Sequence, residues 1–158
     1  MKMIRWTGGV NRVGLLMALV LGSLAGAQQL RAGTSPGASF LAPCPASPNC
    51  VSSQATTAGQ RVDPLRYSGD EARARARLMA VLNHMERVRT THDADGTVHA
   101  EFRSALFGFV DEVAFRFDPP GQIQVRSASQ SGYYDFGVNR RRVEMIRTLF
   151  AEAGEAAP

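Results

Sequence analysis

Apolar residues recur at helical spacing in two segments, which predicts two helices. The first begins near Ser68–Glu71, whose spacing is that of a capping box. It is expected to bury one stripe of apolar residues: Ala74, Leu78, Val81, Leu82 and Met85. The second is expected from Asn139 to Ala153. Its buried residues are expected to be Val143, Met145, Ile146, Leu149 and Phe150.

Between the two helices the apolar residues alternate with polar ones, which predicts strands. The strands are expected at Val88–His92, Thr97–Arg103, Phe109–Phe117 and Gln122–Ser127. Their inward-facing residues are expected to be Val98, Ala100, Phe102, Phe109, Val113, Phe115, Phe117, Ile123 and Val125. Turn sequences at 93–96 and 118–121 make the connections short and favour an antiparallel meander. The predicted fold class is therefore α+β, a single antiparallel sheet of about four strands with two helices packed on one face, in the order α-β-β-β-β-α.

The first 27 residues have the pattern of a secretory signal peptide. Three basic residues, Lys2, Arg5 and Arg12, precede an apolar run over residues 13–24, and small residues follow up to Ala27. Cleavage after Ala27 is predicted. An uncleaved membrane anchor is the alternative, but the run is shorter than the roughly 20 residues that span a bilayer. We expect an exported protein, periplasmic or extracellular, with no transmembrane segment after processing.

The remaining chain is expected to contain a flexible mature N-terminus at residues 28–43, one domain at 44–152 and a flexible tail at 153–158. Apolar residues make up 44% of the 158, which excludes a wholly disordered protein. The formal charge is +4, but removal of the signal peptide leaves 15 basic residues against 14 acidic ones. The charge balance therefore gives no reason to expect a nucleic-acid partner.

The two cysteines, Cys44 and Cys50, enclose two prolines and Asn49, a composition that favours a turn. In an oxidising compartment this spacing predicts one structural disulfide, which would clamp the segment before the first helix. A redox dithiol usually has the spacing C-x-x-C. A zinc site needs about four ligands, and neither histidine nor further cysteine lies near. No metal or cofactor is expected.

Two charged residues occupy positions where the pattern requires apolar side chains. Asp111 has the same parity as Val113 in its strand, and Arg142 lies on the buried arc of the last helix. An unpaired buried charge is costly, so Asp111 and Arg142 are predicted to meet. A bulge after Gly108 that turns Asp111 into solvent is the alternative. Arg140 is expected to pair with Glu144 on the outer surface.

The connection from Arg126 to Arg140 is long and rich in hydroxyls, tyrosines and charges, which is typical of functional loops. The candidate ligand-binding residues are Asp111, Arg126, Ser127, Ser129, Tyr133, Asp135, Asn139, Arg140 and Arg142. A helix start beside Arg140 and Arg142 would attract an anion. The alternative, which we favour, is that Asp135 or Asn139 simply caps the helix.

Several ordered motifs resemble the domain of unknown function 1499 family over about residues 44–150. They are Ser47-Pro48-Asn49-Cys50-Val51-Ser52-Ser53 with Cys44, Phe107-Gly108-Phe109-Val110-Asp111, Arg126-Ser127-Ala128-Ser129 and Gly132-Tyr133-x-Asp135-x-Gly137-Val138-Asn139-Arg140-x-Arg142. The resemblance implies a shared domain and no particular reaction. Gln130 stands where family members often carry a basic residue, which would weaken an anion site here.

Two functions compete. The first is a small binding or interaction module of the cell envelope, whose partner is a small anionic ligand or an envelope protein. The second is a hydrolase-like enzyme acting on an anionic envelope substrate, with a nucleophile among Ser52, Ser53, Ser127 and Ser129 and a base in Asp111 or Asp135. No G-x-S-x-G elbow occurs, and a serine without a placed base is a poor nucleophile. We therefore favour the binding module.

Two metal arrangements are also considered. Asp111, Glu112 and Asp135 could hold calcium, although the nearby arginines argue against an all-acid cage. His92 and His99 flank a turn and could meet across it, but two histidines do not complete a metal site.

Overall fold

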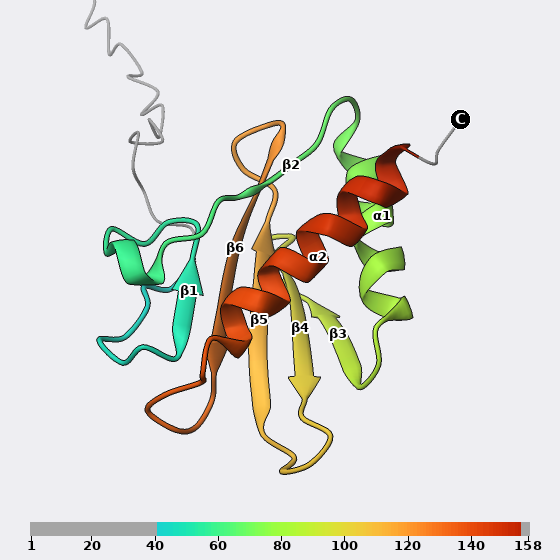
Figure 1. The fold of residues 1–158 in the computed structure, drawn as a ribbon. Helices are drawn as coiled ribbons and strands as arrows, with labels where there is room; N and C mark the ends of the chain where they lie inside the picture. The colour runs from blue at the N-terminus through green and yellow to red at the C-terminus, as the bar shows by residue number, and fades with distance from the viewer. Residues whose placement is uncertain (1–40, 156–158) are drawn as a thin grey trace, which may run out of the picture. The chain divides into compact units, whose positions relative to one another are not determined.

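The computed structural model describes residues 41–155 of the chain (Figure 1). The predicted signal peptide and its cleavage site at Ala27, most of the expected N-terminal segment 28–43, and residues 156–158 lie outside the described residues. In chain order the elements are β1 (Cys50–Ser52), the short 3-10 helix η1 (Ala58–Gln60), β2 (Leu65–Arg66), α1 (Glu71–His84), β3 (Val88–His92), β4 (Val98–Arg103), β5 (Val110–Arg116), β6 (Gln122–Ser129) and α2 (Val138–Glu155).

The strands form a six-stranded antiparallel sheet in the order β1-β6-β5-β4-β3, and the short β2 also pairs with β6. The expected meander of β3 to β6 is confirmed, with each strand hydrogen-bonded to the next. The register aligns Val88, Phe102, Asp111 and Ser129 in one row across it. Because alternate residues face opposite sides, this register places Asp111 on the same face as Val113 and Phe115.

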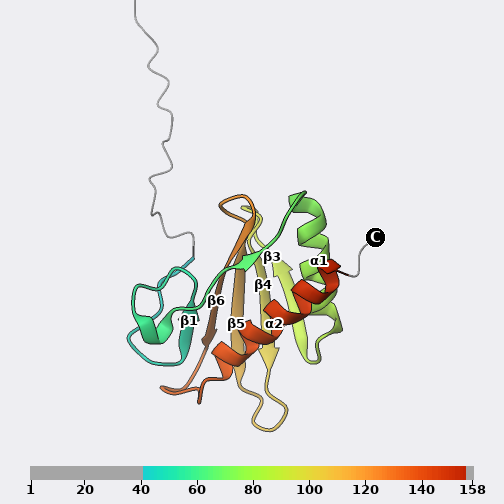
Figure 2. The ribbon, with the colours of Figure 1, turned by 45° about the horizontal axis from the view of Figure 1, so that its top comes forward.

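The hydrophobic core lies between this face and the two helices (Figures 1 and 2). In α1 the residues Ala74, Leu78, Val81 and Leu82 are buried, as expected. In α2 the buried residues are Asn139, Val143, Ile146 and Phe150. Their spacing of three or four makes a single narrow stripe, because α2 crosses the sheet on the diagonal. No helix in residues 41–155 is both long and apolar enough to cross a membrane.

The expectation of about four strands was too low, because β1 and β2 precede α1 and pair with the far strand β6. They have three and two residues, too few to show a period. The folded region also begins earlier than residue 44, since Leu41 is buried. At the other end α2 continues through Glu155, so residues 153–155 of the expected tail are helical.

Other local expectations were wrong for identifiable reasons. The residue that caps α1 is Asp70, not Ser68: its carboxylate accepts a hydrogen bond from the Arg73 amide, 3.0 Å away. Phe109 is exposed because β5 begins only at Val110. Met145 and Leu149 are exposed as well, since they flank the narrow buried stripe of α2.

Candidate functional site

The predicted contact between Asp111 and Arg142 is present. Arg142 Nη2 lies 2.5 Å from Asp111 Oδ2, and the two side chains are only 12% and 10% exposed. The guanidinium carbon of Arg142 also lies 4.8 Å from the centre of the Phe102 ring. The pair therefore ties β5 to the first turns of α2 from inside the fold, and the alternative of a bulge that exposes Asp111 is excluded.

Asn139 is the centre of the polar cluster around this pair, and it is completely buried. Its Oδ1 accepts hydrogen bonds from Ser127 Oγ at 2.5 Å and from Arg142 Nη1 at 2.8 Å. Its Nδ2 donates to the carbonyl oxygen of Asn49 and to Ser129 Oγ, both at 3.0 Å. An asparagine amide can accept two hydrogen bonds and donate two. All four positions of Asn139 are thus occupied by groups of the protein itself.

The disulfide segment joins the same cluster. Cys44 and Cys50 are disulfide-bonded, as predicted, with their Cα atoms 5.6 Å apart. Within the loop that they close, the carbonyl oxygen of Asn49 also accepts from the Ser129 amide at 3.0 Å. Asn49 Nδ2 donates to the Gly132 carbonyl oxygen at 2.5 Å. The clamp therefore holds both the end of β6 and the loop that follows it.

Asp135 serves the start of α2, as the capping alternative requires. Its carboxylate accepts hydrogen bonds from the amides of Gly137 at 2.9 Å and Asn139 at 2.8 Å, and its carbonyl oxygen accepts from the Val138 amide. Burial raises the pKa of Asp135, but these amides outweigh burial and leave its pKa below the ordinary value. The amides that would otherwise attract an anion are already paired.

Arg140 does not pair with Glu144, contrary to expectation. Its guanidinium donates to the carbonyl oxygens of Arg61 at 2.8 Å and Gly59 at 2.9 Å, because α2 runs beside the segment that follows β1. Glu144 instead contacts Arg147, one turn further along the helix. The guanidinium groups of Arg140 and Arg142 are thus bound by the protein itself, and the anion site, the alternative to a helix cap, is not assembled there.

Two other candidates lie away from the cluster. Arg126 is paired in register with Ala114, so it occupies the opposite face of the sheet from Asp111. The sequence interpretation places Arg126 in the loop before the last helix, but β6 continues through Ser129, so Arg126 is a strand residue. Tyr133 is 75% exposed in the loop that follows. A pocket containing Asp111, Arg126 and Arg142 is thus not formed.

The hydroxyls of the four candidate serine nucleophiles all take part in hydrogen bonds within the protein. Ser53 Oγ donates to Gln124 Oε1 at 2.7 Å and accepts from the Val125 amide, and Ser52 Oγ accepts from the Gln54 amide. Ser127 and Ser129 bond to Asn139, as described. The histidines lie elsewhere. His84 contacts the carbonyl oxygen of Ala80 at the end of α1.

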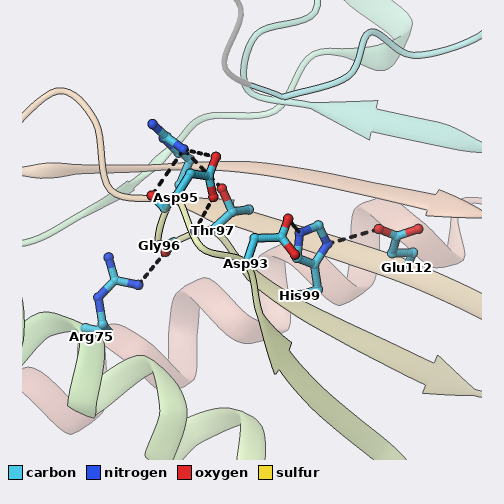
Figure 3. Close-up of polar contacts among 8 residues, drawn as sticks. Arg75, Asp93, Asp95, Gly96, Thr97, His99 and Glu112 are labelled. Carbon is cyan, nitrogen blue, oxygen red and sulfur yellow. Dashed lines mark hydrogen bonds and ion pairs between the residues drawn. The ribbon is translucent and has the colours of Figure 1, made fainter.

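His99 lies on the uncovered face of the sheet, between two carboxylates (Figure 3). Its ring nitrogens lie 2.9 Å from Asp93 Oδ2 and 3.0 Å from Glu112 Oε1. These two carboxylates, and not His92, are the hydrogen-bond partners of the His99 ring. Glu112 and Asp111 point to opposite faces because they are neighbours in β5. Among the described residues no three His, Cys, Asp or Glu side chains are placed so that they could hold a metal ion together, and the calcium arrangement of Asp111, Glu112 and Asp135 is not formed.

One surface was missed by the sequence interpretation. The β4–β5 loop (residues 104–109) and the β6–α2 loop (residues 130–137) project from the same end of the sheet, which we call the apolar end (Figures 1 and 2). It exposes six large apolar side chains: Leu106, Phe107, Phe109, Tyr133, Tyr134 and Phe136. The signal in the sequence is the run Ala105–Val110, which has no charged residue and is too continuous for an ordinary exposed turn.

The comparison with known families agrees with the motifs. Residues 40–150 match the family described as a protein of unknown function (DUF1499), and the chain belongs to this family. No curated protein matches the chain in sequence. The family match covers the sheet, both helices up to Phe150, the disulfide and the polar cluster of this chain.

Proposed function

We propose that this protein is exported to the cell envelope and acts there as a small binding module whose contact surface is the apolar end. One observation carries the proposal. Asn139, at the centre of the polar cluster, has all four of its hydrogen-bonding positions filled by the protein itself, whereas the large apolar side chains of the neighbouring loops are exposed. Large exposed apolar groups that gather on one surface are characteristic of interaction sites.

The polar cluster supports this surface from beneath. Asn139 and Asp135 fix the β6–α2 loop, and the ion pair of Asp111 with Arg142 fixes the start of α2 against β5. These residues are therefore positioning residues for the loops. The hydroxyls of Ser127 and Ser129 bond to Asn139, those of Ser52 and Ser53 bond to other groups of the protein, and no histidine is hydrogen-bonded to them within residues 41–155. This arrangement favours binding over hydrolysis.

Export is supported by two independent features. The chain begins with a basic segment, an apolar run and small residues at Ala25 and Ala27, in the order that signal peptidase requires. Its two cysteines form a disulfide, a bond typical of oxidising compartments. We expect N-terminal sequencing of the cell-envelope or secreted form to begin at Gln28. Recovery of intact Met1 in a membrane fraction would contradict the processing.

The binding role is tested by envelope association. The double variant Leu106→Ser with Phe107→Ser should reduce the share of processed protein that fractionates with the envelope, while its thermal unfolding stays unchanged. Leu149→Ser, an exposed apolar residue on α2 outside the apolar end, is the matched control and should leave fractionation unaltered. Equal association of both variants with the parent protein would overturn the proposed surface.

A further inference from the structure

The loops of the apolar end carry almost no charge. Residues 104–109 contain no charged side chain, and residues 130–137 contain only Asp135, whose carboxylate is occupied by two amides. Within each loop two aromatic rings lie close together. In the β4–β5 loop the Phe107 and Phe109 ring centroids lie 5.7 Å apart, and in the β6–α2 loop those of Tyr134 and Phe136 lie 5.0 Å apart. The apolar end therefore presents pairs of aromatic rings that are exposed and are not packed into the core of the described residues.

Arginines surround these loops. Arg103 directly precedes the β4–β5 loop and lines a surface pocket with Arg87, Arg89 and Glu101. Arg141 lies beside the β6–α2 loop, where its Nη1 donates to the Phe136 carbonyl oxygen at 2.9 Å. Arg87 is paired with Glu86, whereas Arg89, Arg103 and Arg141 form no ion pair within residues 41–155. A collar of cations thus borders the apolar surface.

The other end of the sheet has the opposite character. Its turns, residues 93–96 and 118–121, form what we call the polar end, and they carry Asp93, Asp95 and Asp118. Figure 3 shows Asp93 and Asp95 with their polar contacts. Hydrogen bonds from Thr97, against some burial, place the pKa of Asp95 below its ordinary value, and Arg116 adds to this effect. At this end the Asp95 carboxylate is paired with Arg116, whereas Arg103 and Arg141 at the apolar end have no ion pair within residues 41–155.

The backbone supports a fixed presentation of the apolar side chains. Phe136 has a φ of +54°, a left-handed conformation that is rare for a bulky residue. It is nevertheless 78% exposed, so packing of its ring does not explain the conformation. The backbone after Phe136 is held by the Asp135 carboxylate, which accepts hydrogen bonds from the amides of Gly137 and Asn139. Strain of this kind persists where the surroundings impose it, and it occurs preferentially at binding sites.

We infer that the apolar end docks on the surface of an anionic phospholipid bilayer. Aromatic and aliphatic side chains of the two loops enter the interfacial region, and Arg103 and Arg141 bind the lipid phosphates around them. The charge distribution favours a lipid surface over a second copy of the chain, because the same cationic collar on two facing copies would repel. The carboxylates of the polar end point away from the membrane. This inference rests on the proposed binding function and names its partner.

Vesicle binding tests the inference directly. The protein, purified in the form in which cells accumulate it, is mixed with vesicles of phosphatidylglycerol and phosphatidylcholine or of phosphatidylcholine alone. We expect binding to the anionic vesicles that weakens as salt is added. Leu106→Ser with Phe107→Ser should weaken it by about tenfold or more, since two apolar side chains no longer leave water.

The cationic collar is tested with matched charge variants. Arg103→Gln with Arg141→Gln should weaken binding to the anionic vesicles by about fivefold per arginine. Arg66→Gln with Arg73→Gln makes the same change in net charge on exposed residues of β2 and α1, and it should have little effect. Equal losses in the two pairs would show that only net charge matters and would overturn the assigned docking surface.

Orientation is tested with tryptophan probes and brominated lipids. Bromine in the acyl chains should quench the tryptophan fluorescence of the Phe107→Trp variant. It should not quench the fluorescence of Ala94→Trp, which places the probe on an exposed residue of the polar end. Equal quenching of both probes would overturn the orientation. If vesicles are not bound while envelope association in cells still depends on Leu106 and Phe107, the lipid inference fails and the proposed binding module stands, with a protein as its partner. Self-association that the loop variant abolishes, without vesicle binding, would assign the surface to a second copy.

Discussion

At the polar end of the sheet the carboxylates lie outside and the aromatic rings inside, whereas at the apolar end the rings lie outside and an ion pair lies inside. Phe117 is buried at the polar end, with its ring 5.9 Å from Tyr67 and beneath the Arg75 guanidinium. At the apolar end Phe107 and Phe136 face solvent above the pair of Asp111 and Arg142. Loops held by buried polar groups need none of their own apolar side chains for packing, so those side chains are available for binding.

The largest expected effect comes from the ion pair beneath the apolar end. Asp111→Ala and Arg142→Ala should each lower the free energy of unfolding by about 3–5 kcal/mol, because each leaves a buried charge without its partner. The double variant should lose much less than the sum. Chemical denaturation of the four proteins measures all three values.

The control for this cycle lies at the polar end. Glu71 forms an ion pair with Arg75 on α1, with nitrogen and oxygen 3.0 Å apart, and Glu71→Ala should cost about 0.5 kcal/mol or less. Only the carboxylate is removed, because Arg75 also contacts the Gly96 carbonyl oxygen and the Phe117 ring. Small, additive losses for Asp111 and Arg142 would remove the contrast between the two ends.

The disulfide should have the next largest effect. Replacing Cys44 and Cys50 together by serine should lower the free energy of unfolding by about 2 kcal/mol, by the loop-entropy estimate for so short a loop. Asn49, inside this loop, bonds to Ser129, so the Ser129 amide should exchange its hydrogen faster in the variant. Unchanged exchange at Ser129 would mean that the clamp does not hold the apolar end.

Asp135→Asn should cost about 1 kcal/mol at neutral pH, as the loss of a charged acceptor at a helix start typically does. The pKa of Asp135 is lowered in the folded protein, so its contribution is fully present above the unfolded pKa of about 4 and is lost as pH falls through the folded pKa. The stability difference between parent and variant should therefore shrink below about pH 4. A difference that is constant from pH 7 to pH 2 would contradict this assignment.

The smallest effect on the free energy of unfolding is expected for the exposed apolar side chains of the β4–β5 loop. Leu106→Ser with Phe107→Ser should change the free energy of unfolding by only about 0.5 kcal/mol, because neither side chain is packed in the fold. Phe117→Ala at the polar end should cost about 3 kcal/mol or more, since its ring is buried. Comparable losses in the two experiments would show that the loops of the apolar end pack more tightly than their exposure indicates.

The sequence predicted the parts of the fold in which a period is long enough to detect. The alternation in β3 to β6 located four strands, and the parity of Asp111 identified a buried charge together with its partner. The strands β1 and β2 could not be predicted in this way, because a segment of two or three residues shows no period. Their pairing with β6 depends on contacts about 60 or more residues apart in the chain.

The sequence predicted several members of the polar cluster, but not how they are arranged. Asp135 and Asn139 were both possible caps, but only the structure distinguishes the residue that serves the amides from the one that is buried as a hub. Arg126 and Ser127 could not share a site once β6 extended through both, because neighbours in a strand face opposite ways. Phe109 has the parity of the inward-facing residues of β5 and was therefore predicted to be buried, although it belongs to the exposed loop before the strand.

The β4–β5 loop closes on itself, and the pairing of its two strands does not depend on the loop residues. Its closure uses two hydrogen bonds within the loop, from the Ser104 amide to the Phe109 carbonyl oxygen and from the Phe109 amide to Ser104 Oγ. The pairing of β4 with β5 sets the strand register independently of the residues between them. Loop length and composition can therefore change at little thermodynamic cost. A protein engineer can therefore replace or lengthen this hairpin loop and keep the sheet beneath it unchanged.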